Sequence, residues 1–282
     1  TRVSASSDGY ADGHRLRVGV HAMRPRFRIG LAIGLLLVGV VALLLSLFVG
    51  AESLPIAAII TEWRSGKPIA DCPLLSILVF QRVPRTLAAI FAGSTLALVG
   101  CTFQALLRNP LATPYTLGVA SAGALGAFGA TVLWGGVAAR AAIFGISGVQ
   151  AAAFITALLN MGAIYVMAAR HPRMSPSVLL LTGVTLSMLS NAGILFLRYL
   201  AKPNMLVTMD RWLMGGVDVM GFRDIKTLAV GTVPCALVLL AQANKLDQIG
   251  FDVELAAGRG INIRRLQAVV FIVGSLATAV VV

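Results

Sequence analysis

Charge is scarce in this sequence and missing from its long apolar stretches. Only 12% of the 282 residues are charged and 11 are acidic, whereas 58% are hydrophobic and the mean hydropathy is +0.89. About a quarter of the residues in a typical soluble domain are charged. The composition therefore excludes a soluble globular domain and indicates a membrane protein that crosses the bilayer several times.

Clustered metal ligands and nucleotide-binding glycines are also lacking. The three cysteines form no CxxC pair, and the three histidines show no ligand spacing. Metal and haem sites need clustered ligands, so we expect this chain alone to build neither. No G-x-x-x-x-G-K-[ST] motif occurs, so any ATP chemistry must come from a partner.

Seven uncharged runs are long enough to cross a bilayer once each. We therefore predict an all-α helical bundle, with the basic segment 1–28 as a tail in the cytoplasm and 29–282 as the transmembrane domain. The predicted crossings are 29–51, 86–107, 109–139, 141–169, 174–197, 227–243 and 266–282.

The distribution of basic residues gives the predicted orientation. With Thr1 in the cytoplasm, 13 of the 23 lysines and arginines fall in cytoplasmic segments and 10 on the outer side. This modest excess follows the positive-inside rule. The net charge of +12 is spread over both sides rather than gathered on one soluble face, so we expect no nucleic-acid partner.

The segment 81–122 carries the most informative pattern in the chain. Thr86 to Leu107 is about 22 uncharged residues, enough to cross a hydrocarbon layer of roughly 30 Å. Pro84 suits a first helical turn, and Pro110 predicts that the helix stops before it. In the next crossing Ala122, Gly126 and Ala130 recur every four residues, which predicts close approach of another helix.

These residues resemble a known family. Arg-x-Pro-Arg at 82–85, Gln-Ala-Leu-Leu-Arg-Asn-Pro-Leu-Ala at 104–112 and Leu-Gly-Val at 117–119 are similar to the permeases of bacterial ABC importers for iron chelates, haem and vitamin B12. The stretches 211–216 and 250–265 agree with that family. The resemblance runs from about residue 46 to the end of the chain.

The resemblance implies a function and a set of partners. The chain would be the permease subunit, not an enzyme, of an importer in the bacterial inner membrane. It would pair with a second permease copy, two ATP-binding subunits that hold ATP and Mg, and a periplasmic binding protein. The expected cargo is a ferric siderophore or haem, with cobalamin as the alternative. The other class considered is an ion-coupled secondary transporter. Such transporters commonly place ionisable residues within the membrane. In this sequence no charged residue needs to lie within a predicted crossing, which favours the ABC importer.

The loop 242–265 has readable helix caps. Asp252 can cap a short helix from Val253 to Ala257, Gly258 can close it with Gly260 completing the turn, and Asn262 can cap the next crossing. In the family that the chain resembles, this loop docks on the ATPase. The predicted docking residues are Asp252, Glu254, Ala256, Ala257, Gly258 and Gly260.

Two further sets of site residues are predicted at the outer side. Arg82 and Arg85 either snorkel to the interface or, as the resemblance implies, meet carboxylates of the binding protein. Two cations at a helix N-terminus oppose its macrodipole, which favours the second interpretation. The resemblance also implies that the fifth predicted crossing and the outer segment 198–226 border the translocation path, through Asn191, Met205, Met209, Trp212 and Met214. The alternative, that the methionines only pack against neighbouring side chains, stays open.

The chain ends inside an apolar run. Members of the family continue through about three more crossings, to ten in all. We therefore expect the sequence to be truncated at its C-terminus.

Overall fold

The computed structural model describes residues 25–50, 54–135, 142–143, 146–170, 176–217, 219 and 221–281. Most of the predicted tail, residues 1–24, lies outside this part of the chain. The chain divides into two compact units, Thr1–Ser53 and Leu54–Val282. In the first unit, the apolar helix α1 (Pro25–Phe48) contains a 20-residue candidate span, Ile29–Phe48.

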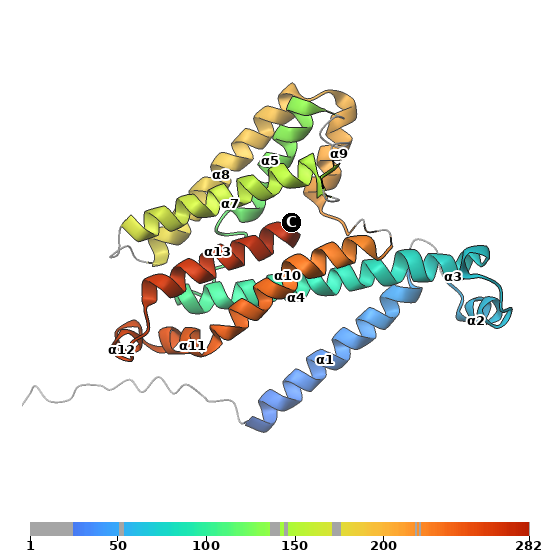
Figure 1. The fold of residues 1–282 in the computed structure, drawn as a ribbon, viewed down its shortest axis with the longest axis horizontal. Helices are drawn as coiled ribbons and strands as arrows, with labels where there is room; N and C mark the ends of the chain where they lie inside the picture. The colour runs from blue at the N-terminus through green and yellow to red at the C-terminus, as the bar shows by residue number, and fades with distance from the viewer. Residues whose placement is uncertain are drawn as a thin grey trace, which may run out of the picture. The chain divides into compact units, whose positions relative to one another are not determined.

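The second unit is almost entirely helical (Figure 1). It begins with the short elements α2 (Ile56–Arg64), η1 (Ile69–Asp71), α3 (Pro73–Ile77) and the π-helical turn η2 (Leu78–Arg82). Two antiparallel strands of two residues, β1 (Ala142–Ile143) and β2 (Ile146–Ser147), form a small hairpin. The remaining elements are α4 (Val83–Leu107), α5 (Val119–Trp134), α7 (Gly148–Arg170), α8 (Pro176–Leu200), α9 (Pro203–Met214), α10 (Arg223–Ala241), α11 (Ala243–Phe251), α12 (Val253–Gly258) and α13 (Ile263–Val281).

Each of the seven predicted crossings corresponds to one apolar helix: α1, α4, α5, α7, α8, α10 or α13. Across the described residues, six helices are long and apolar enough to span a bilayer, and α5 is a shorter apolar helix. The prediction of an all-α polytopic bundle is confirmed. The predicted start of the second crossing is wrong, because helical structure runs without a break from Pro73 to Leu107.

The largest core cluster joins α4, α10, α11, α12 and α13 with parts of α5, α7 and α8. At its centre the rings of Phe103 on α4 and Phe271 on α13 lie 5.8 Å apart. Gly274 permits this contact, since a Cβ there would come within 2.9 Å of the Phe103 ring. The core thus fixes α13 on α4, and it continues to the short helices at one end of both.

The small residues of α5 lie against α7, with which α5 makes its most extensive contact. Ala122, Gly126 and Ala130 are all buried. A Cβ on Gly126 would lie 2.5 Å from the carbonyl oxygen of Ala152. The close approach predicted from the four-residue spacing is therefore confirmed, and its partner is α7.

The turn between α4 and α5 is tightly held. Oγ1 of Thr116 accepts a hydrogen bond from the Thr113 amide (2.8 Å), and Oγ1 of Thr113 accepts one from the Thr116 amide (3.1 Å). Nδ2 of Asn160 on α7 donates to the carbonyl of Leu117 (2.9 Å). A Cβ on Gly118, whose φ is 76°, would lie 2.9 Å from Oγ of Ser187 on α8. The turn is therefore locked to two neighbouring helices.

Candidate functional site

Two short helices, α11 and α12, lie at the end of the bundle where α4 stops and α13 begins (Figure 1). Asp252 separates them. Its Oδ1 accepts hydrogen bonds from the amides of Glu254 (2.7 Å) and Leu255 (3.0 Å), so the predicted N-cap is confirmed. A capped helix between two membrane crossings makes this end a structured surface rather than a loose loop.

The charge of Asp252 is stabilised by its surroundings. Hydrogen bonds from the amides of Leu255 and Glu254 lower the pKa of this carboxyl below its ordinary value, and the nearby Arg108 guanidinium adds to the effect. Arg108 ends α4 in the left-handed conformation with φ of 49°. The end of α4 and the start of α12 are thus electrostatically linked.

Most of the predicted docking residues are exposed, but one of them is buried beneath the others. Glu254, Ala257, Gly258 and Gly260 are exposed together with Asp252, whereas Ala256 is 0% exposed. The side chain of Ala256 joins Leu246 and Ile249 of α11 in the core cluster that holds Leu107 and Val270. Ala256 therefore anchors this surface and does not form part of it.

One predicted cap was misplaced. Gly258 is the last residue of α12, and the left-handed residue is Gly260, with φ of 83°. The amide of Ile261 then donates a hydrogen bond to the carbonyl of Ala256 (3.2 Å), which closes the helix two residues later than predicted. The cap on α13 is confirmed, because Oδ1 of Asn262 accepts from the Arg265 amide (3.0 Å).

The other end of α4 is organised by Pro84. Proline has no N–H, so it cannot bond to the carbonyl four residues earlier, which is that of Phe80. The π-turn η2 covers this point, and the freed Phe80 carbonyl accepts a hydrogen bond from the amide of Gly221 (2.9 Å). The start of α4 is thereby tied to the segment before α10.

Arg82 and Arg85 lie next to this connection. Arg82 is half-buried and Arg85 is exposed. Both fall well inside the 35-residue helical stretch that begins at Pro73. The predicted conflict with a helix macrodipole is therefore wrong, since the effect acts only in the first turn.

The predicted path residues on α8 and α9 that the structure describes differ in their exposure. Asn191 and Met214 are exposed and Met205 is half-buried. Met209 is 1% exposed and packs among Ala127, Phe128, Ala153 and Ile194.

Met209 is thus a core residue in this structure, because the apolar face of α9 turns it toward α5. The side chain of Trp212 lies outside the described residues. An ion pair between Arg198 and Asp210 joins the end of α8 to α9.

Comparison with known proteins identifies the family to which these features belong. The sequence profile of the FecCD transport family matches residues 36–282. This chain belongs to the FecCD transport family.

Two relatives show the breadth of the FecCD family. The ferric enterobactin transport system permease FepD of Escherichia coli strain K12 is 32% identical over 257 residues, covering 88% of this chain and 72% of FepD. The vitamin B12 import system permease BtuC of Klebsiella pneumoniae is 33% identical over 219 residues, covering 77% of this chain and 60% of BtuC. The chain thus spans about 60 to 70% of the length of these relatives.

A solved structure has the same fold. It is an inward-facing conformation of a metal-chelate type ABC transporter, with a TM-score of 0.72 and 24% identity over 89% of this chain and 74% of that one. The helices described here are therefore arranged as in that structure.

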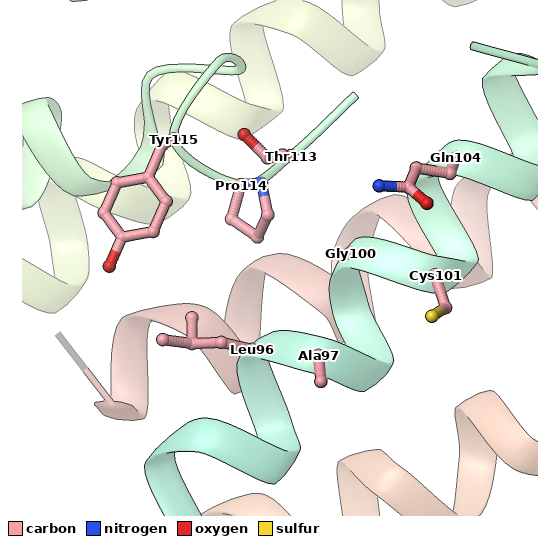
Figure 2. A pocket seen from close by; sticks show the side chains of 8 residues that line it. All are labelled: Leu96, Ala97, Gly100, Cys101, Gln104, Thr113, Pro114 and Tyr115. Atoms are coloured by element: carbon pink, nitrogen blue, oxygen red, sulfur yellow. The ribbon is translucent and has the colours of Figure 1, made fainter. Parts of the chain in front are cut away.

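One feature of this FecCD chain was missed by the sequence analysis. A hollow of about 360 Å³ lies between α4 and the turn 113–115 (Figure 2). On the α4 side, small and polar residues line much of the hollow. The lining residues of α4 are Leu96, Ala97, Gly100, Cys101 and Gln104. These positions recur every three or four residues on one helix face, and that spacing was the available signal. Among the described residues, no group of three potential metal ligands comes together.

Proposed function

We propose that this FecCD-family chain is the membrane-spanning permease subunit of an ABC importer. The observation that carries the proposal is the capped α11–α12 surface, which is fixed by its own core to the ends of α4 and α13. Such a surface can receive force from a partner and pass it to the crossings. The chain has no P-loop motif, so the ATP and Mg belong to the partner.

The contacts described above distinguish the two ends of the bundle. The α4–α5 turn lies with α11 and α12 at one end, since Arg108 acts on Asp252. The segment before α10 lies at the other end, where Gly221 bonds to Phe80. We place the first end and the N-terminus in the cytoplasm of a bacterial cell, at its inner membrane, because 13 of the 23 lysines and arginines then fall on that side. A second permease copy, two ATP-binding subunits and a periplasmic binding protein complete the proposed assembly.

The proposed cargo is an iron chelate, either a ferric siderophore or haem. FepD, named for ferric enterobactin, supports this choice. BtuC, named for vitamin B12, is similar to the same degree and makes cobalamin the second candidate. All three are bulky metal complexes. The proposal therefore names this class of cargo first and the iron chelate within it second.

Loss of the ATPase tests the docking surface. The double substitution Glu254→Lys and Ala257→Trp reverses a charge and adds bulk on exposed positions of α12. We expect the variant to insert normally and to lose the ATP-binding subunit during co-purification. Asp71→Lys, a charge reversal at the other end of the bundle, is the matched control. Retention of the ATPase by the α12 variant would remove this surface from the proposal.

Uptake assays test the transported substance and its energy source. Labelled ferric siderophore, haem and cobalamin are offered to cells that lack their own systems and express the permease with its partners. We expect uptake of one of the three, which stops when ATP is depleted while the proton gradient is kept. Uptake that follows the gradient instead would indicate a secondary transporter.

A further inference from the structure

Helix α2 exposes a line of large apolar side chains. Ile56, Ile60 and Trp63 are 56%, 42% and 73% exposed. Their spacing of four and three residues places them on one face of Ile56–Arg64. We call these three residues the apolar stripe. The stripe is separate from the α2 residue that packs inward, Ile59, which is 8% exposed.

The single acidic residue of α2 is turned inward. Oε2 of Glu62 accepts a hydrogen bond from the amide of Leu75 (3.0 Å) in the first turn of α3. The carboxylate therefore lies at a helix start, where negative charge is stabilised. The charged residues that follow on the exposed side are Arg64 and Lys67, with Asp71 further along in η1.

The surface of α2 has three sides that carry different kinds of side chain. Glu62 faces α3, which α2 contacts, and Ile59 is buried. The apolar stripe forms the second side. Ala57 and Thr61 lie on the third side and are exposed, small or polar. A helix with one side for protein, one for apolar surroundings and one for water is typical of the bilayer surface, where tryptophan is enriched.

The position of α2 along the bundle agrees with this surface. Its contact α3 forms the first residues of the candidate span Pro73–Leu107. This 35-residue helical stretch is about 52 Å long. Membrane helices tilt by about 20° on average and by up to about 40°, so the stretch covers roughly 40 to 49 Å across the membrane, close to the thickness of a bilayer with its headgroups. The start of the stretch, and α2 with it, then reaches the headgroup layer.

We propose that α2 is an interfacial helix that binds the phospholipid surface. The apolar stripe enters the boundary between headgroups and acyl chains, and Arg64 and Lys67 bind the phosphates of anionic lipids. In the orientation proposed above this is the outer leaflet. The helix thereby sets the depth and tilt at which the second crossing enters the membrane.

The fluorescence of Trp63 tests the proposal directly. In a Trp134→Phe/Trp212→Phe variant, Trp63 is the single tryptophan. The variant is placed in nanodiscs of phosphatidylglycerol or of phosphatidylcholine. We expect blue-shifted Trp63 emission that lipids brominated near the headgroup quench and that acrylamide quenches weakly.

A reporter on the water side of the same helix is the control. Thr61→Trp with Trp63→Phe, in the same background, moves the indole by two residues to the face of Ala57. We expect severalfold stronger acrylamide quenching for this variant. Equal acrylamide quenching of both reporters would overturn the proposal. Shielding of Trp63 from acrylamide and from brominated lipid alike would also overturn it and point to a protein partner.

A second measurement avoids the tryptophan substitutions. Cys72 and Cys235 are buried and Cys101 is exposed. In a Cys101→Ala background, Ile60→Cys and Thr61→Cys are treated with a membrane-impermeant maleimide in nanodiscs. We expect rapid labelling at position 61 and protection at position 60. Equal labelling of the two positions would contradict the interfacial location.

The charge part of the proposal has its own test. In Arg64→Gln/Lys67→Gln, we expect the Trp63 emission to lose the additional blue shift that phosphatidylglycerol gives over phosphatidylcholine. The same shift in the variant and in the parent would show that these two residues do not bind the headgroups.

Discussion

At the scale of single residues, glycine 126 carries the packing of α5 on α7. The Gly126→Ala substitution places a methyl group 2.5 Å from the Ala152 carbonyl and still closer to the Thr156 side chain. Overpacking of this kind costs about 1 to 3 kcal/mol. We expect a lower melting temperature in detergent for this variant.

Gly129 offers a matched control on the same helix. A Cβ at Gly129 would meet nothing within 4 Å. Gly129→Ala replaces a poor helix former with a good one and is expected to leave the melting temperature unchanged or higher. Equal destabilisation by both substitutions would show that the close contact of Gly126 with α7 does not decide the effect.

Residue patterns predicted contacts well where a single side chain decides the geometry. The caps by Asp252 and Asn262 each follow from one residue type at one position, and the close packing of α5 follows from small residues at four-residue spacing. Met209 shows the opposite case. Whether a methionine on α9 faces a path or a core depends on how the whole helix is rotated against α5, and periodicity within α9 does not contain that information.

At the scale of elements, α12 depends on an ionised cap. The Asp252 pKa is lowered in the folded chain, so its contribution to stability is present above the ordinary carboxyl value of 3.8 and is lost as pH falls through the depressed pKa. We expect protection of the Glu254 and Leu255 amides from hydrogen exchange at neutral pH and less protection in acid.

Two substitutions separate the cap from its charge. Asn is a good N-cap without a titrating group, so Asp252→Asn is expected to keep protection at all pH values. Asp252→Ala removes the acceptor and is expected to expose both amides even at neutral pH. A pH dependence that persists in Asp252→Asn would mean that another group controls α12.

The start of α4 shows why a helix can extend beyond the residues that mark its start in the sequence. Pro84 and the charges of Arg82 and Arg85 indicate a helix start, yet the helix begins at Pro73. The π-turn absorbs the missing amide, and the Phe80 carbonyl finds its donor in Gly221. That donor lies far along the chain, and a local reading of proline does not include it.

At the scale of the whole molecule, substitution of Arg82 and Arg85 tests whether the end opposite α12 binds the periplasmic binding protein. Substitution of both by Glu is expected to weaken capture of an acidic binding protein, because each exposed ion pair contributes about 0 to 1 kcal/mol and the contributions add. The loss of affinity should be smaller at high salt, where such pairs are already screened. Affinity is measured per folded permease over a series of salt concentrations.

The control reverses charge at the other end, with Arg264→Glu/Arg265→Glu measured without the ATPase. Both residues are exposed beside α12. We expect unchanged affinity for the binding protein. If the Arg82/Arg85 variant inserts poorly but binds normally once folded, the two arginines are interfacial anchors.

The lock on the α4–α5 turn has a mechanical consequence. The carbonyl of Leu117 accepts a hydrogen bond from Asn160, and Gly118 packs closely against Ser187, so the turn that links α4 and α5 is held to α7 and α8. Because α12 shares a core with these four helices, we expect a force on α12 to move them together. At the other end, a backbone hydrogen bond from Gly221 to Phe80 and the π-turn before Pro84 join the start of α4 to the segment before α10.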